Sequence, residues 1–128
     1  MCIRDRHSNM RELGCEDWEH PVHIEFFEND GSAGFKLNAG MQIHGHWMRG
    51  MPQKAIAIFA RGTYGTEVIE HQIFPNLQIN QYENILLRPS GNDQSSTMIR
   101  DGLGAMIARD INLDYQEFRQ AALFINGN

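Results

Sequence analysis

Histidines are the residues of this chain with the most direct potential for metal chemistry, because a neutral imidazole ring is a common metal ligand. His44 and His46 are two residues apart, so on a β-strand both side chains would project from the same face. A zinc site needs about four ligands. The further candidates are scattered along the chain without motif spacing: His20, His23 and His71. We therefore favour histidines on the surface of a sheet over a metal site.

Asp93 and Asp101 are two carboxylates whose separation could suggest acid–base chemistry. A structural role suits both residues better. Asn92-Asp93 is typical of the turn ahead of a helix, since these side chains bond to nearby backbone N–H groups. Arg100-Asp101 is typical of residues that form ion pairs. We predict structural roles for both aspartates.

The remaining chemical signals are weak. The aromatic residues that could form a carbohydrate platform are spread thinly, which is typical of core residues: Trp18, Trp47, Tyr64 and Tyr82. The glycines lack the spacing of a phosphate-cradling Walker loop: Gly45, Gly50 and Gly62. Cys15 has no neighbouring motif that would make it a nucleophile.

The composition is that of a folded, mildly acidic domain. Of the 128 residues, 41% are hydrophobic and 21% are charged, which argues against intrinsic disorder. A formal net charge of −5, with no run of Lys or Arg, lacks the electrostatic footprint of a nucleic-acid-binding protein. No apolar run approaches the ~20 residues of a membrane-spanning helix. The two cysteines, Cys2 and Cys15, are too few for a disulfide framework.

Several β-strands must position these residues. Residues 22–26 alternate apolar and polar side chains and precede a turn cluster with the pair Asp30-Gly31. Residues 55–59 are the most hydrophobic segment. The other predicted strands are 34–37, 41–44 and 82–87. A loop over 46–53 contains Gly50 and Pro52.

One helix follows the strands. Ser95, Ser96 or Thr97 can cap it. Its apolar residues recur at helical spacing: Met98, Ile99, Leu103, Met106 and Ile107. A connector over 110–116 and a last strand over 119–125 complete the pattern. Strands, then a helix, then a strand predict an α+β domain with a mainly antiparallel β-sheet and one principal helix.

Both ends of the chain suggest a piece of a longer protein. Residues 1–6 look like translated sequencing-adapter sequence, so we exclude them from the fold, and residues 7–20 form a polar lead-in segment. Asn126-Gly127 after the last predicted strand is the strongest short hairpin signal. The partner strand would lie beyond Asn128. We therefore expect a domain over 21–128 that lacks its C-terminal remainder.

A series of short motifs runs along about residues 18–128. The motifs are His20-Pro21-Val22, Phe26-Phe27, Asp30-Gly31, Asn38-Ala39-Gly40-Met41-Gln42-Ile43-His44-Gly45, Phe59-Ala60-Arg61, Tyr64-Gly65, Leu86-Leu87-Arg88, Gly91-Asn92-Asp93, Ile99-Arg100-Asp101 and Phe124-Ile125-Asn126-Gly127. Their order resembles the N-terminal half of the CotH kinase family, the atypical kinase-like proteins named for a spore-coat protein. Met48 and Gln53 stand where the family usually has serine and lysine.

The resemblance implies ATP-dependent phosphorylation of protein side chains, with Mg²⁺ bound by aspartates beyond Asn128. It therefore implies no catalytic or metal-binding residue in this chain, and an inactive fragment that binds no cofactor stably. Phosphoryl transfer needs cations around the β and γ phosphates, so Lys54 and Arg49 are the candidate nucleotide contacts. The competing interpretation is a solvated basic pair beside a loop.

The same resemblance suggests an extracellular, cell-surface or spore-coat protein. The expected partners are a protein substrate and the missing C-terminal part of the domain. The alternative function is a non-catalytic, exported surface or adhesion module on the same fold.

Overall fold

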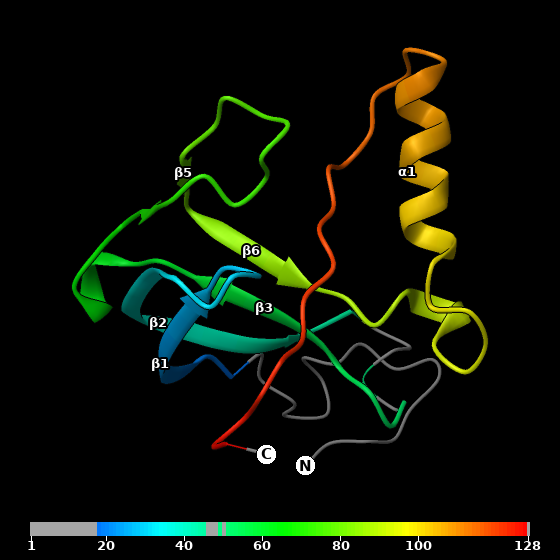
Figure 1. Cartoon of the computed structure of the whole chain (residues 1–128). Helices are drawn as coiled ribbons and strands as arrows, with labels where there is room; N and C mark the ends of the chain where they lie inside the picture. The colour runs from blue at the N-terminus through cyan, green and yellow to red at the C-terminus, as the bar shows by residue number, and fades with distance from the viewer. Residues whose placement is uncertain (1–17, 46–48, 50, 128) are drawn as a thin grey trace.

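A computed structural model describes residues 18–45, 49 and 51–127, and these residues form an α+β fold (Figure 1). The strands are β1 (His20–Phe27), β2 (Ala33–His44), β3 (Ala55–Phe59), β4 (Ile69–Glu70), β5 (Gln81–Tyr82) and β6 (Asn84–Leu87). The helices are the short 3₁₀ turns η2 (Gly62–Tyr64) and η3 (Gly91–Asp93) and the α-helix α1 (Arg100–Asp110). The predicted fold class is confirmed.

The main sheet has four antiparallel strands in the order β1-β2-β3-β6. Its second strand is longer than the sequence predicts, because β2 joins the two segments expected at 34–37 and 41–44. Gly40 continues the strand and pairs with Pro21 on one side and Phe59 on the other. A Cβ at Gly40 would lie 2.2 Å from the Glu19 carboxylate, so glycine makes room there for Glu19. Gly40 therefore marks a close approach of a side chain to the strand rather than a break in it.

The core lies on one face of this sheet. Its fully buried members are Ala39, Ile56 and Ile58, which come from the two central strands. Partly buried residues of all four strands complete it: Val22, Ile24, Leu37, Met41, Ile85 and Leu87. Four of the five residues of β3 are buried, as expected for the most hydrophobic segment. Alternation along β1 and β2 turns the polar residues to the opposite face.

A second, smaller cluster holds the segment between β3 and β6. Ala60, Ile69 and Ile73 are its buried residues, and Ile69 is completely inaccessible. β4 and β5 form a separate two-stranded sheet. The strand expected over 82–87 is divided at Glu83, whose carbonyl accepts a hydrogen bond from the Ala60 N–H.

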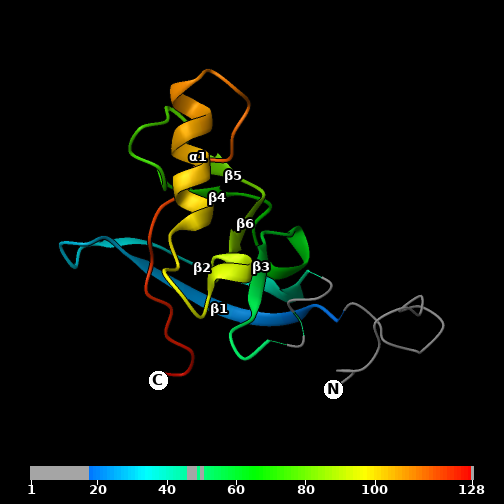
Figure 2. The ribbon, with the colours of Figure 1, turned by 90° about the vertical axis from the view of Figure 1, so that its right-hand side faces the viewer.

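α1 stands to one side of the sheet (Figures 1 and 2). Among the described residues, neither hydrophobic cluster includes a residue of α1. The helix begins at Arg100, and Met98 before it has a positive φ of 59°, which α-helical backbone does not allow. In the part of the chain that the structure describes, no helix has both the length and the apolar character to cross a membrane.

The predicted last strand is wrong. Residues 119–125 have no strand pairing and run back from the far end of α1 past the sheet (Figure 1). Leu123, Phe124 and Ile125 stay exposed, so the apolar run is not buried against an edge strand. Asn126 and Gly127 do adopt a turn with φ values of 53° and 80°, the two positive angles of the hairpin turn predicted for this pair. Residues 1–6 and most of the predicted lead-in segment lie outside the described residues.

Candidate functional site

Lys54 lies directly before β3, at the end of the loop that connects β2 to β3. Its side chain is partly buried, and its ammonium donates a hydrogen bond to the Met51 carbonyl. The side chain thus turns back onto its own loop.

Arg49 belongs to the same loop. Its Nε–H donates a hydrogen bond to the carbonyl of Gly45, the residue that follows β2 with a positive φ of 87°. Both candidate cations therefore hold backbone carbonyls of one loop at one end of the sheet. We call the described residues 45, 49 and 51–54 the basic loop. The intervening positions 46–48 and 50, which include His46 and Trp47, lie outside the described residues.

The basic loop keeps the chemical capacity to bind an anion. The Lys54 ammonium carries more N–H donors than its bond to Met51 uses. A backbone bond also limits where each cation can move, which lowers the entropy lost when a ligand is bound. The arrangement is thus compatible with phosphate contact and equally with bracing of the loop.

The histidines that the structure describes do not converge. His20, His23 and His44 are exposed on β1 and β2, which confirms sheet-surface positions for these three. His23 contacts Asn38 at 2.8 Å, whereas His71 lies apart and contacts Glu28 at 2.7 Å. Within the described ranges, no group of three or more His, Cys, Asp or Glu side chains could hold a metal ion.

Asp93 has the structural role predicted for it. Its side chain is only 1% exposed and accepts hydrogen bonds from the Thr97 hydroxyl and from the Arg100 N–H. The hydroxyl of Thr97, helped by backbone N–H groups and the charge of Arg100, holds the pKa of Asp93 below its usual range although burial opposes this. The Arg100 N–H at the start of α1 is therefore satisfied by Asp93, and not by one of the predicted capping residues Ser95, Ser96 or Thr97. Thr97 instead donates its hydroxyl group to Asp93.

Asp101 also has the predicted structural role. Its carboxylate pairs with Arg88 at 2.8 Å, while Arg100 lies 3.5 Å from Asp93. These two ion pairs tie α1 to the segment that follows β6. Among the described residues, Asp93 and Asp101 are thus explained by the helix and its preceding turn, without acid–base chemistry.

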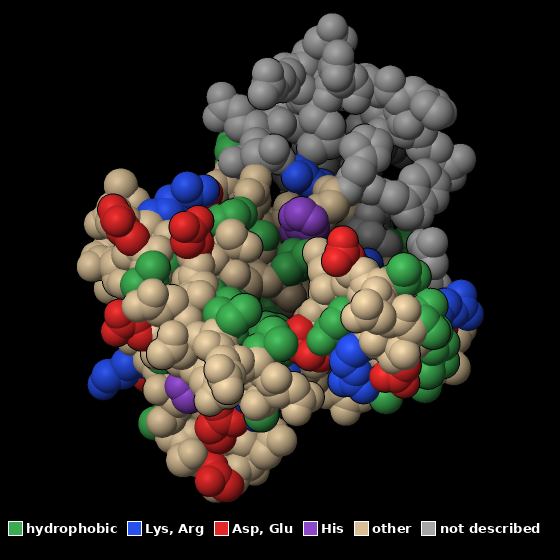
Figure 3. All heavy atoms as spheres, turned by 90° about the horizontal axis from the view of Figure 1, so that it is seen from above, with side chains coloured by type: hydrophobic (Ala, Val, Ile, Leu, Met, Phe, Trp, Pro, Cys, Tyr) green, Lys and Arg blue, Asp and Glu red, His purple; other side chains and the backbone are tan. Residues whose placement is uncertain are grey.

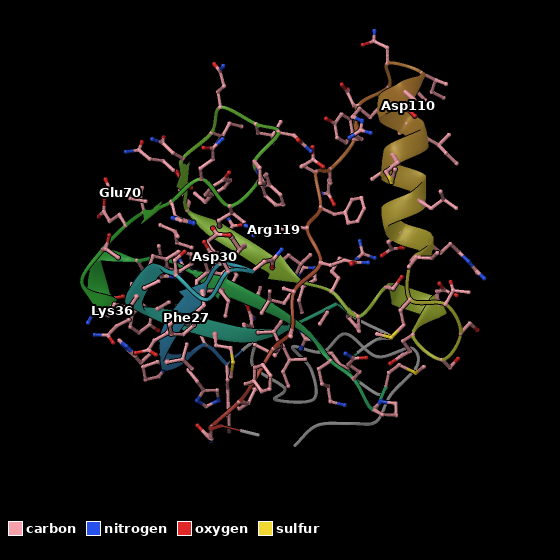
Figure 4. The ribbon with its side chains drawn as sticks, in the orientation of Figure 1. Phe27, Asp30, Lys36, Glu70, Asp110 and Arg119 are labelled. Atoms are coloured by element: carbon pink, nitrogen blue, oxygen red, sulfur yellow. The ribbon has the colours of Figure 1, made fainter. Side chains whose placement is uncertain are left out.

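The most connected cluster of charged groups was not predicted. Glu28, directly after β1, receives both NH groups of Arg119, and its Oε1 lies 2.7 Å from the His71 ring. Arg119 also donates to the Ile73 carbonyl at 2.9 Å. In Figure 4 Arg119 projects from the C-terminal segment toward the β1–β2 turn. We call Glu28, His71 and Arg119 the carboxylate cluster.

Aromatic rings form the floor of the carboxylate cluster. Phe26 and Phe35 stack with centroids 5.1 Å apart, and the Arg119 guanidinium lies 5.5 Å from the Phe26 centroid. Gly34 leaves room for these rings, because a Cβ there would lie 2.6 Å from Phe26 and 3.0 Å from the His71 ring. Arginine 119 holds the pKa of Glu28 below its ordinary value, and His71 lowers it further. The cluster anchors the C-terminal segment to Glu28 and to the Ile73 carbonyl.

Among the described residues, the other aromatic side chains of the predicted set come from separate parts of the fold. Tyr82 packs edge-on against Phe74 in the second cluster, which confirms a core position for it. Trp18 is 65% exposed beside His20, so its predicted core position is wrong. Tyr64 ends η2.

A scan against protein-family models and searches of curated proteins and of solved structures found no match to the chain.

Proposed function

We propose that the four-stranded sheet is the nucleotide-covering part of a CotH-like protein kinase, which in its intact form transfers a phosphoryl group from ATP, with Mg²⁺, to side chains of a protein substrate. The proposal has two supports. One is the ordered set of sequence motifs. The other is the position of Lys54 and Arg49 on a single loop next to the most buried strand.

The basic loop supplies what a nucleotide-covering loop requires. Catalysis of phosphoryl transfer consists largely of positioning and of charge stabilisation around the phosphates. β3 is buried along most of its length and paired on both sides, so it holds the backbone of Lys54 rigidly. The ammonium can keep its bond to Met51 while other N–H groups meet a phosphate oxygen. We assign phosphate contact to Lys54 and Arg49.

The test uses the complete kinase in which this proposal places the chain. Lys54→Ala should weaken ATP binding or lower turnover by about tenfold or more, which corresponds to roughly 1.4 kcal/mol. Lys36→Ala is the matched control, because Lys36 is an exposed lysine on β2 (Figure 4). Equal nucleotide affinity and rate in both variants would reduce Lys54 to a brace of its loop.

Stability measurements separate the two roles of Lys54. Loss of its bond to Met51 should lower the free energy of unfolding by about 1 kcal/mol, since the donor is charged and partly buried. A surface lysine without such a bond usually contributes about 0.5 kcal/mol or less. If Lys54→Ala loses nucleotide binding while its free energy of unfolding falls by no more than about 1 kcal/mol, the variant is still folded and the loss of binding supports the phosphate role directly.

A non-catalytic binding module on the same fold is the second candidate. The large hydrophobic side chains that α1 and the C-terminal segment leave exposed favour it. The 128-residue chain alone should show no metal-dependent ATP turnover under either candidate. Turnover of ATP by the complete protein would favour the kinase. Nucleotide binding without turnover would leave both candidates open, and phosphoryl transfer to a protein acceptor would then have to be measured.

A further inference from the structure

The side of α1 that faces away from the chain is more hydrophobic than the side that faces it. Gly102 is buried and Ala105 half-buried, and a Cβ at Gly102 would lie 2.5 Å from the Phe118 ring. The exposed side carries five large aliphatic residues, each between 43% and 62% exposed: Ile99, Leu103, Met106, Ile107 and Ile111. We call these five the α1 stripe. Figure 3 shows hydrophobic side chains gathered at the edge of the molecule where α1 lies.

This arrangement is the reverse of an ordinary surface helix, which turns its large apolar side chains toward the core and its polar ones to water. Spacings of three and four residues place the members of the α1 stripe on one continuous face. Single exposed hydrophobic residues are common, but a continuous apolar face marks a surface that binds another molecule. The α1 stripe is therefore an interaction surface.

Charges at the two ends of α1 identify the occupant. Arg100 at the start lies 3.5 Å from Asp93, and Asp110 at the end lies 3.4 Å from Arg109. The two side chains nevertheless remain 72% and 70% exposed, so each can reach a further partner. Arg100 precedes Leu103 by three residues and Asp110 follows Met106 by four, so both charges border the stripe. Asp110 projects at the free end of α1 (Figure 4). Two copies of α1 in antiparallel contact would bring each Arg100 to the Asp110 of the other copy, whereas parallel contact would bring like charges together.

We propose that α1 packs antiparallel against α1 of a second copy of this chain through the α1 stripe, as a two-fold symmetric dimer with two Arg100–Asp110 ion pairs. Such an interface is isologous and closes on itself. Five aliphatic side chains from each copy make a small interface, so the dimer dissociates on dilution. This inference does not depend on nucleotide binding.

Sedimentation velocity of the 128-residue chain over about 1 to 100 μM tests the proposal. We expect a dimer at the upper end of this range. Leu103→Glu should weaken dimerisation by about tenfold or more, since it places a charge in the centre of the stripe. Phe124→Glu is the control, because Phe124 is 73% exposed in the C-terminal segment, outside the stripe. It should leave the dimer intact.

A charge reversal gives a second, independent result. Asp110→Lys should weaken the dimer although a base at the end of a helix favours the helix itself. Asp114→Lys makes the same change of net charge beyond α1 and should not weaken it. A monomer at all concentrations, a particle larger than a dimer, loss of association in Phe124→Glu but not Leu103→Glu, or equal weakening by the two lysine variants would each overturn the proposal. If Leu103→Glu does not fold, the comparison of Asp110→Lys with Asp114→Lys decides alone.

Discussion

Asp93 illustrates how a single buried carboxylate can organise several residues around it. It is almost fully inaccessible and accepts bonds from the side chain of Thr97 and the backbone of Arg100, so its charge is compensated at the start of α1. The pair Asn92-Asp93 made this role predictable. The choice of Asp93 over the three hydroxyl residues that follow it was not predictable, because Ser, Thr and Asp are about equally suited to capping.

Thr97→Val tests this role without removing the carboxylate. The variant leaves the shape of residue 97 almost unchanged but removes the hydroxyl that Asp93 accepts from. We expect a loss of about 1 kcal/mol in the free energy of unfolding, measured with urea. Ser96→Ala, at the exposed neighbouring position, should change it by less than about 0.5 kcal/mol. Equal values for the two variants would contradict the assigned role.

Glu28 makes stability depend on pH in a defined direction. Arg119 first, and then His71, hold the pKa of Glu28 below its ordinary value of 4.5. A carboxylate with a lowered pKa stabilises the folded state fully above that ordinary value, and its contribution is lost as the pH falls through the folded-state pKa. Glu28→Gln should therefore be less stable than the natural chain at pH 7, and the difference should shrink at an acid pH below the lowered folded-state pKa.

Urea unfolding of Glu28→Gln at both pH values checks the expectation for the carboxylate cluster. Glu25→Gln on β1 is the matched control, because Glu25 is exposed and lies 3.7 Å from the His23 ring rather than against an arginine. A difference at pH 7 that persists unchanged in acid would mean that charge at Glu28 does not stabilise the fold.

At the scale of elements, regular local sequence patterns predicted the strands, whereas the pairing and contacts of segments far apart in the sequence could not be predicted. β3 coincides with the predicted segment 55–59, and β1 extends the predicted 22–26 by a few residues, because alternation and apolar runs reflect burial in a sheet. The run at 121–125 has the same composition but no strand to pair with. Arg119 is held by Glu28 and Ile73, contacts that no neighbouring residue signals.

In the candidate site, too, local features could be predicted from the sequence and long-range contacts could not. The position of Lys54 at the entry to β3 could be predicted from the sequence of the loop and strand. The direction of its side chain could not, because it depends on where the Met51 carbonyl lies. His71 and Arg119 join Glu28 from 43 and 91 positions away along the chain, so no spacing rule could have found that cluster.

Replacing each of the two glycines of α1 by alanine should change the stability of the protein by a different amount. A Cβ at Gly104 would meet no atom within 4 Å, so Gly104→Ala should stabilise the protein by about 1 kcal/mol through helix propensity. Gly102→Ala brings the same propensity but would push the Phe118 ring away from the helix. We expect this variant to gain less, and to be less stable than Gly104→Ala. Thermal unfolding of both proteins checks the order, and equal gains would show that Phe118 moves without cost.

For the whole molecule, the buried residues are concentrated in the sheet, and α1 lies outside both hydrophobic clusters of the described chain. Local stability should follow this distribution, since segments with few buried apolar contacts open more readily. We predict that amide hydrogens of β2 and β3 exchange with solvent far more slowly than those of α1. Hydrogen-exchange mass spectrometry at low protein concentration, where α1 is not covered by a second copy, measures this. Equal protection of α1 and β3 would contradict it.

The contact between Glu28 and Arg119 also has a consequence for the order of folding. It closes a stretch of 91 positions, whereas β1 and β2 meet across a short turn. Closing a long stretch costs more chain entropy than closing a short one, although the cost rises only slowly with length. We therefore expect the β1–β2 hairpin to form early and the C-terminal segment to dock after the sheet is complete. An interaction that forms last slows unfolding without speeding folding. The expected kinetic effect of the Glu28–Arg119 contact is thus to slow the unfolding of a sheet that has already assembled.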